Sequence, residues 1–154
     1  VMSITVKAFY QAVLAGDVPA LERLIDDGFC LICPTQDHVL SGVYEGKQRF
    51  FNDVMPRVFG CVNPEEIAFC QAHQIVVEAG EVVVAMAQNA GLAKSSERYD
   101  QIYLHVFKVR AGKIVALIEC FDTALANRAL WQGGDPLIPN HLPALSNLAH
   151  FQQA

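Results

Sequence analysis

The chain has 154 residues, a length that suits one domain with a single hydrophobic core. Hydrophobic residues make up 53% of it and charged residues 18%, so the sequence predicts a folded, soluble protein with a large core, an apolar cavity or an apolar interface. The net charge is −5 and there is no basic stripe, which excludes nucleic acid as an expected partner. The apolar runs are too short to cross a bilayer and the N-terminus lacks a signal-peptide pattern, so we expect no membrane association and a cytoplasmic location.

The first half of the chain has the periodicity of helices. Residues 4–15 carry apolar side chains at the i, i+3, i+4 spacing of an amphipathic helix. Gly16 ends that helix, and Asp17 can cap a second helix that stops at Asp26-Asp27-Gly28. A short strand, Phe29–Cys33, and a loop over residues 35–46 are expected next. A third helix is then predicted over Lys47–Phe59, with Phe50, Phe51, Val54 and Met55 inward and Pro56 breaking or kinking its last turn.

From Ile67 onward the period changes to two, which predicts strands. Four are expected, at Ile67–Val77, Glu81–Asn89, Tyr99–Val109 and Lys113–Phe121. Asp122 can cap a final helix, Thr123–Trp131. Helices followed by consecutive strands predict an α+β fold with helices on one face of an antiparallel sheet. We therefore expect one domain over residues 1–131 and a tail over residues 132–154 without packed structure of its own.

The cysteines give no firm signal of a metal or redox site. Cys30 and Cys33 have the C-x-x-C spacing, but a zinc site needs a second pair of ligands, and a redox pair needs a helix start where this sequence predicts a strand. All five cysteines are expected to be buried free thiols: Cys30, Cys33, Cys61, Cys70 and Cys120. Because His38, His141 and His150 fall in loop or tail and do not cluster with carboxylates, we expect no metal and no cofactor.

Three stretches resemble the NTF2-like superfamily, and its SnoaL-like branch most closely. They are Phe9-Tyr10 through Ala15-Gly16-Asp17, the loop Gly42-Val43-Tyr44-Glu45-Gly46, and the run from Tyr99 to Leu130 with its Arg-Ala-Gly-Lys turn and Phe-Asp helix entry. The resemblance covers roughly residues 4–131. It implies a conical domain, a curved mixed or antiparallel sheet around N-terminal helices, an apolar cavity, and a homodimer formed through the sheet. It says little about reaction, because the fold hosts unrelated chemistries.

The last strand pair is predicted to bring the polar groups of a site together. Arg110-Ala111-Gly112 suits a three-residue hairpin loop, which places His105 opposite Leu117 and Tyr103 opposite Glu119. One face of the hairpin then carries Gln101, Tyr103, His105, Phe107, Val115, Leu117, Glu119 and Phe121. The other face is almost wholly apolar, and we expect it to pack against another subunit or layer: Ile102, Leu104, Val106, Ala116, Ile118 and Cys120.

Known members of the superfamily help to interpret these residues. The resemblance to ketosteroid isomerases places a protonated carboxyl group at His105 and their basic carboxylate near Cys33, so steroid isomerisation by that base is not expected. In limonene-epoxide hydrolases one catalytic aspartate matches Glu119, whereas their Arg-x-Asp pair falls at Ala87-Gln88-Asn89. A histidine and one carboxylate therefore remain in the expected places.

We expect a domain that binds a small hydrophobic ligand. If it is an enzyme, it is a cofactor-free isomerase, cyclase or hydratase acting on a carbonyl compound, with His105 and Glu119 as the acid–base pair and Tyr103 orienting one of them. The residues expected to contact the ligand are Phe9, Tyr10, Tyr44, Asn89, Gln101, Phe107, Leu117, Phe121 and Trp131. The alternative is a non-catalytic ligand-binding or dimerisation module, with His105 as a core histidine and a cavity filled by side chains.

Overall fold

A computed structural model describes residues 2–154. In chain order the first elements are α1 (Met2–Ala15), α2 (Val18–Leu24), β1 (Ile25–Cys33), β2 (Gly42–Glu45), α3 (Lys47–Arg49), the π-helical turn η1 (Phe50–Val54) and α4 (Met55–Phe59). They are followed by β3 (Val62–Ala79), β4 (Val82–Ala93), β5 (Ile102–Arg110), β6 (Lys113–Phe121), α5 (Thr123–Ala126), the π-helical turn η2 (Asn127–Trp131), the 3₁₀ turn η3 (Leu145–Asn147) and α6 (Leu148–Gln153).

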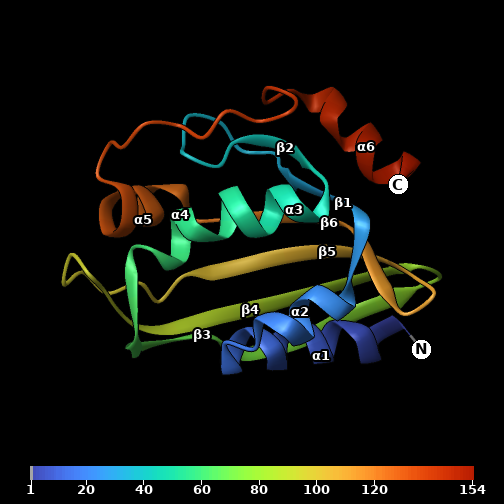
Figure 1. Ribbon diagram of the computed structural model, residues 1–154, viewed down its shortest axis with the longest axis horizontal. Helices are drawn as coiled ribbons and strands as arrows, with labels where there is room; N and C mark the ends of the chain where they lie inside the picture. Colours follow the sequence, from blue (N-terminus) through green and yellow to red (C-terminus); the bar gives the residue numbers. More distant parts are fainter. Residues whose placement is uncertain (1) are drawn as a thin grey trace.

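The six strands form one open sheet in the order β2-β1-β6-β5-β4-β3. Its strand pairs are antiparallel except for β1 with β6, which run parallel. Helices α1, α2 and α3–α4 lie across one face of the sheet, as Figure 1 shows. The predicted α+β fold is therefore confirmed, and the sheet is mixed rather than purely antiparallel because β1 runs parallel to β6.

Side-chain caps and an apolar stripe explain where the helices form. Helix α1 buries Val6, Phe9 and Tyr10 against the sheet. The Asp17 carboxylate accepts the Ala20 amide at the start of α2, and the Asp122 carboxylate accepts the Leu125 amide at the start of α5. Both aspartates are N-caps, as their sequence positions predict.

Bulges bend the outer strands of the sheet. The β3–β4 register shifts between Ala68 and Ala72, where Cys70 adopts a positive φ of 56°. Gly91 sits opposite Ile67 with a φ of 146°, and a Cβ there would collide with the Ile67 backbone. Only glycine combines this backbone conformation with so close an approach. The bends curve the sheet around the helices.

The β5–β6 hairpin has a different register from the one expected. Its loop has two residues, Ala111 and Gly112, both with positive φ (51° and 76°), rather than three. A bulge between Lys108 and Val109 then restores the alternation. The predicted pairing is wrong by two residues, because two-residue loops with positive φ match the strand twist even when the first residue is alanine.

As a consequence, His105 lies opposite Glu119, and Tyr103 lies opposite Phe121. Phe107 pairs with Leu117 rather than with Val115. Most side chains still lie on the face of the hairpin where they were expected, because a register shift of two residues leaves each side chain on the same face of the sheet. Val115 alone leaves the inner face, where Ile114 is buried instead.

The segment expected as a loop contains strand β2, and the expected tail is packed. Val43 pairs with His141, and Phe151 of α6 packs against Cys30, Ile32 and Ala116 on the outer face of the sheet. In Figure 1 the C-terminal segment runs past β2 before it enters α6. The prediction of a tail without packed structure is therefore wrong, because the segment pairs with β2 at His141 and α6 packs on the sheet.

The outer face of β4 and β5 remains uncovered in the single chain. Met86, Ile102 and Leu104 are 40%, 47% and 42% exposed, respectively. Among residues 2–154, no helix is long and apolar enough to span a membrane.

Candidate functional site

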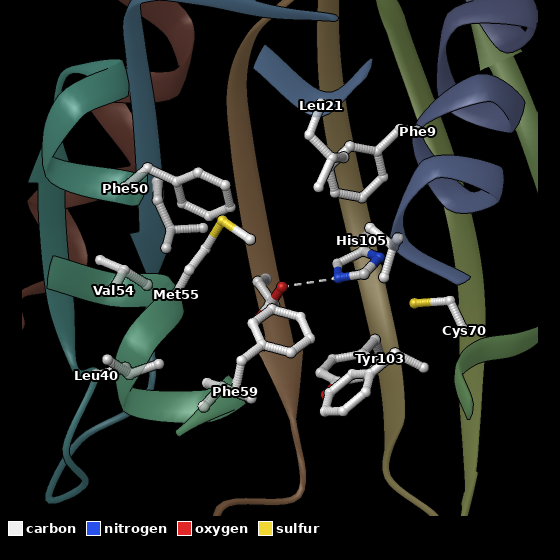
Figure 2. A pocket seen from close by; sticks show the side chains of 15 residues that line it. Phe9, Leu21, Leu40, Phe50, Val54, Met55, Phe59, Cys70, Tyr103 and His105 are labelled. Atoms are coloured by element: carbon white, nitrogen blue, oxygen red, sulfur yellow. Dashed lines mark hydrogen bonds and ion pairs between the residues drawn. The ribbon is translucent and has the colours of Figure 1, made fainter. Parts of the chain in front are cut away.

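A cavity of about 90 Å³ lies between the sheet and the helices. Its walls are apolar: Phe9 comes from α1, Leu21 from α2, and Phe50, Met55 and Phe59 from the α3–α4 helix. Figure 2 shows these side chains around a floor made by β5 and β6. That floor carries the polar groups of the cavity, Tyr103, His105 and Glu119.

A continuous hydrogen-bonded chain joins three side chains at this floor. The Tyr10 hydroxyl lies 2.8 Å from Nδ1 of His105, and Nε2 of His105 lies 2.9 Å from Oε2 of Glu119. Burial, followed by the nearby Cys70 and Glu119, raises the pKa of Tyr10 far above its usual value. Tyr10 therefore keeps its proton, and its hydroxyl is able to donate a hydrogen bond to Nδ1.

The carboxylate of Glu119 defines the tautomer of the neutral histidine. A carboxylate only accepts hydrogen bonds, so Nε2 of His105 carries the proton that faces Glu119, and in the neutral ring Nδ1 is then the acceptor for the Tyr10 hydroxyl. Glu119 uses Oε2 for this contact, and within residues 2–154 its Oε1 has no hydrogen-bond partner. The carboxylate is thus oriented by the protein through one oxygen and borders the cavity.

Aromatic rings fix the plane of the imidazole. Tyr103 stacks on His105 with ring centroids 5.2 Å apart, and Tyr10 stacks at 5.8 Å. Phe107 meets the same ring edge-on at 5.3 Å. Rotation of the His105 ring is therefore blocked by packing as well as by its two hydrogen bonds.

Tyr103 contributes to this arrangement through its ring. Its hydroxyl accepts a hydrogen bond of 3.1 Å from Nδ2 of Asn89, while Oδ1 of Asn89 accepts the Cys70 amide at 2.9 Å. Burial raises the pKa of Tyr103 well above its usual value. Asn89 therefore links the β3 bulge to the stacked tyrosine, and the residue that hydrogen-bonds His105 is Tyr10.

The apolar residues predicted to contact a ligand lie at different depths. Phe9 lines the cavity, whereas Phe107 and Leu117 lie fully buried in the core beneath it. Phe121 is half-buried and contacts the rings of Tyr103 and Trp131.

Three further predicted contact residues form hydrogen bonds with backbone groups of the protein itself: Tyr44, Gln101 and Trp131. The Tyr44 hydroxyl donates to the carbonyl of Ser41, and the Trp131 indole donates to the carbonyl of Arg57. The buried Gln101 amide donates to the Asp122 carbonyl and accepts the Asp122 amide. These contacts hold the loop before β2 and the start of α5 on the sheet, and they hold η2 against α4.

The sequence predicts many residues of the cavity wall as core residues and does not show that they line a cavity. Phe50, Val54 and Met55 were expected to face inward, and the structure makes them one side of the cavity. Cys70 also lines it, although nothing in the local pattern marks a positive-φ cysteine. Burial raises the pKa of the Cys70 thiol to about 12.

The cysteines and histidines outside the cavity confirm some expectations and correct others. All five cysteines are free as expected, but Cys61 and Cys120 are partly exposed rather than buried. Cys30 and Cys33 belong to separate clusters on opposite faces of β1. By contrast, His141 and His150 gather around Glu45. The expectation that these histidines do not cluster with a carboxylate is wrong, because the tail returns to β2.

The fold is shared with proteins of known structure. Solved structures with the same fold include an NTF2-like protein of unknown function from Burkholderia pseudomallei, with a TM-score of 0.70 and 21% identity over 84% of this chain and 96% of that one. A candidate isomerase from Bacillus subtilis has a TM-score of 0.69 and 21% identity over 89% and 96%. A candidate polyketide cyclase from Pseudomonas putida has a TM-score of 0.65 and 18% identity over 82% and 95%.

These likenesses show that the chain has the fold of an NTF2-like protein. The model of the SnoaL-like domain matches residues 6–117, and the chain belongs to that family. A search of curated proteins finds no match. The family assignment that the sequence suggests is therefore confirmed.

Proposed function

We propose that this SnoaL-like domain is a cofactor-free acid–base enzyme that isomerises or cyclises a small apolar carbonyl compound. The observation that carries the proposal is the chain Tyr10–His105–Glu119, which presents an oriented carboxylate to an apolar cavity. Such an arrangement suits removal of a proton next to a carbonyl group.

Each residue has a distinct part in the proposed reaction. Oε1 of Glu119 takes a proton from the carbon next to the substrate carbonyl, and the electron pair moves toward the carbonyl oxygen. The same carboxyl group returns the proton at another carbon, which makes the reaction an isomerisation and balances it without a cofactor. His105 holds Oε2 in place, and Tyr10 keeps His105 in the tautomer that donates to it.

The position of Glu119 makes it a better candidate than the neighbouring thiols. Cys33 lies on β1, where the resemblance to ketosteroid isomerases places a basic carboxylate. Burial raises the pKa of the Cys33 thiol well above its usual value, so it stays protonated at neutral pH. Glu119 supplies the carboxylate of the cavity lining.

The size of the cavity limits the substrate. About 90 Å³ is well below the roughly 300 Å³ that drug-sized ligands occupy. The substrate is therefore small, or the α3–α4 helix moves outward to admit it. The π-helical turn η1, which carries Phe50 and Val54, is a suitable place for such a movement, because turns of this kind are common at functional sites.

The proposal is tested with a small unsaturated ketone. Cyclohex-3-enone is incubated with the protein, and formation of the conjugated isomer is followed by ultraviolet absorbance. We expect a protein-dependent rate that falls at least a hundredfold in Glu119→Gln and His105→Ala, since general acid–base catalysis contributes about 10²–10⁴-fold. Full activity in both variants, with folding confirmed by circular dichroism, would refute the assignment.

The small cavity also favours a second candidate function, a ligand-binding or dimerisation module without catalysis. In that case His105 and Glu119 form a structural hydrogen bond, and no ketone is converted. Native mass spectrometry of freshly purified protein separates binding from dimerisation alone, because a bound compound adds its mass to the chain.

A further inference from the structure

A second group of polar side chains lies at the sheet edge, where the C-terminal segment crosses β2. Nε2 of His141 is 2.8 Å from Oε1 of Glu45, and Nδ1 of His150 is 3.8 Å from the same oxygen. One donor atom from each of the three residues lies within 4.8 Å of the other two. None of these residues takes part in the cavity described above.

We propose that Glu45, His141 and His150 bind a divalent transition-metal ion of the zinc class, which ties the C-terminal segment to β2. Two imidazole nitrogens and one carboxylate oxygen are a donor set that zinc accepts, usually with water as fourth ligand. Mg²⁺ and Ca²⁺ prefer oxygen donors alone, so the two histidines select against them.

The spacing of the donor atoms suits tetrahedral coordination. Zinc–ligand bonds of 2.0–2.1 Å place neighbouring donors about 3.3 Å apart. The two measured separations from Oε1 of Glu45, 2.8 and 3.8 Å, fall on either side of that value. Since Glu45 and His141 are exposed and His150 is half-buried, side-chain rotations are enough to close the set.

The backbone that carries His141 is held independently of any ion. The Val43 amide donates to the His141 carbonyl at 3.0 Å, and the Asn140 amide donates to the Val43 carbonyl at 2.7 Å. The Asn140 side chain accepts the Glu45 amide at 3.0 Å. Glu45 therefore lies on the paired strand β2, and His141 lies on a segment that is bridged to that strand.

The helix that carries His150 is also anchored. Phe151 of α6 packs on the outer face of the sheet, and the Lys108 ammonium donates to the carbonyls of Phe151 and Gln152, at 3.1 Å each. Preorganised ligands lose little conformational freedom on binding, which favours affinity.

The two imidazole rings lie against each other beside Glu45. Their centroids lie 4.3 Å apart with an interplanar angle of 29°. Glu45 and His150 also border an open hollow that reaches Cys30, which leaves room for the ion and its water. One histidine is enough to form an ion pair with Glu45, whereas here two histidines lie near the same carboxylate oxygen.

The test is zinc binding by the whole chain after treatment with a chelator. Isothermal titration with ZnCl₂ should give one site per chain, and the melting temperature should rise with zinc concentration. In His141→Ala/His150→Ala both effects should disappear. Glu45→Gln should weaken binding at least tenfold, because it keeps an oxygen but loses the charge.

Cys30→Ser is the matched control, since the Cys30 thiol borders the same hollow and is a possible zinc ligand of another kind. We expect its zinc affinity to equal that of the unchanged protein. Zinc binding that survives in the double histidine variant, or that is lost in Cys30→Ser, would overturn the proposal. The proposal would also be overturned if zinc did not raise the melting temperature of the unchanged protein. The three residues would then form an ion pair only. Circular dichroism of the zinc-free variants verifies that they fold.

Discussion

At His105, both ring nitrogens have partners and two tyrosine rings stack on the imidazole. The sequence placed His105, Glu119 and Tyr103 on one face, and the structure has them there. It could not reveal Tyr10 as the donor to Nδ1, because the contact joins residues 95 positions apart. The periodicity of a strand predicts the face on which a side chain lies. Which hydroxyl reaches the His105 ring depends on how α1 packs on the sheet, and the local pattern does not show that.

The role of Tyr10 can be tested by comparing Tyr10→Phe with a control substitution, Tyr44→Phe. Tyr10→Phe removes the hydroxyl that donates to Nδ1, so the tautomer of His105 is no longer fixed. We expect a loss of about 1–2 kcal/mol in the free energy of unfolding and at least a tenfold fall in kcat on the ketone. Tyr44→Phe, which removes a buried hydroxyl bonded to backbone carbonyls, should lose similar stability but keep kcat. Equal kcat values for both variants would contradict the assigned role.

His38 should give the protein a pH-dependent stability. Burial lowers its pKa to about 4 from an ordinary value of 6.5, partly offset by Glu119. Its Nδ1 accepts the Leu40 amide, so protonation breaks that bond. The unfolded chain binds more protons between pH 6.5 and 4, and this contribution to stability is therefore complete above pH 6.5 and lost as pH falls toward 4. Chemical denaturation across this window should show a smaller decline in His38→Gln. An equal decline in the free energy of unfolding for the unchanged protein and His38→Gln would contradict this role of His38.

At the scale of elements, the sequence identified the helices up to Trp131 and the long strands, but not β2, α6 or the packing of the tail. Helix α1 and the β5–β6 hairpin have long, regular hydrophobic patterns. Strand β2 has four residues, too few for a period, and it is held by β1 and by His141. The hairpin register failed because Ala111 adopts a positive φ that alanine seldom takes.

Gly42 tests whether the C-terminal segment docks on β2. Gly42 and Gly46 both have positive φ, 108° and 97°, so alanine is strained at either position. A Cβ at Gly42 would also collide with the His141 carbonyl and Pro139, whereas a Cβ at Gly46 meets nothing within 4 Å. We expect Gly42→Ala to lose about 1–2 kcal/mol more stability than Gly46→Ala in urea denaturation. Equal losses would show that the segment does not dock there.

At the scale of the whole molecule, the family and the α+β fold follow from patterns spread over most of the chain. The cavity volume could not be predicted in the same way, because it depends on how closely the α3–α4 helix approaches the sheet. The reaction is harder still, since one fold accommodates many chemistries. The apolar composition is shared among the core, the cavity wall and the uncovered outer face.

That outer face leads us to propose that two chains associate through β4 and β5. Met86 pairs with Leu104 across the two strands, and both are partly exposed. We expect a dimer by analytical ultracentrifugation at micromolar concentration, and a monomer for Leu104→Glu, which buries a charge in the interface. Ile4→Glu, at an exposed position of α1, should remain dimeric. A monomeric unchanged protein would refute the dimer.

The central claim is that Glu119 acts as a base on a carbonyl compound in the cavity. The most direct measurement is exchange of the α-protons of cyclohexanone in D₂O, followed by ¹H nuclear magnetic resonance with the unchanged protein and with Glu119→Gln. We predict exchange faster than in buffer with the unchanged protein, and a fall of at least a hundredfold in the protein-dependent rate in Glu119→Gln. Exchange no faster than in buffer, or equal rates for the two proteins, would contradict the claim.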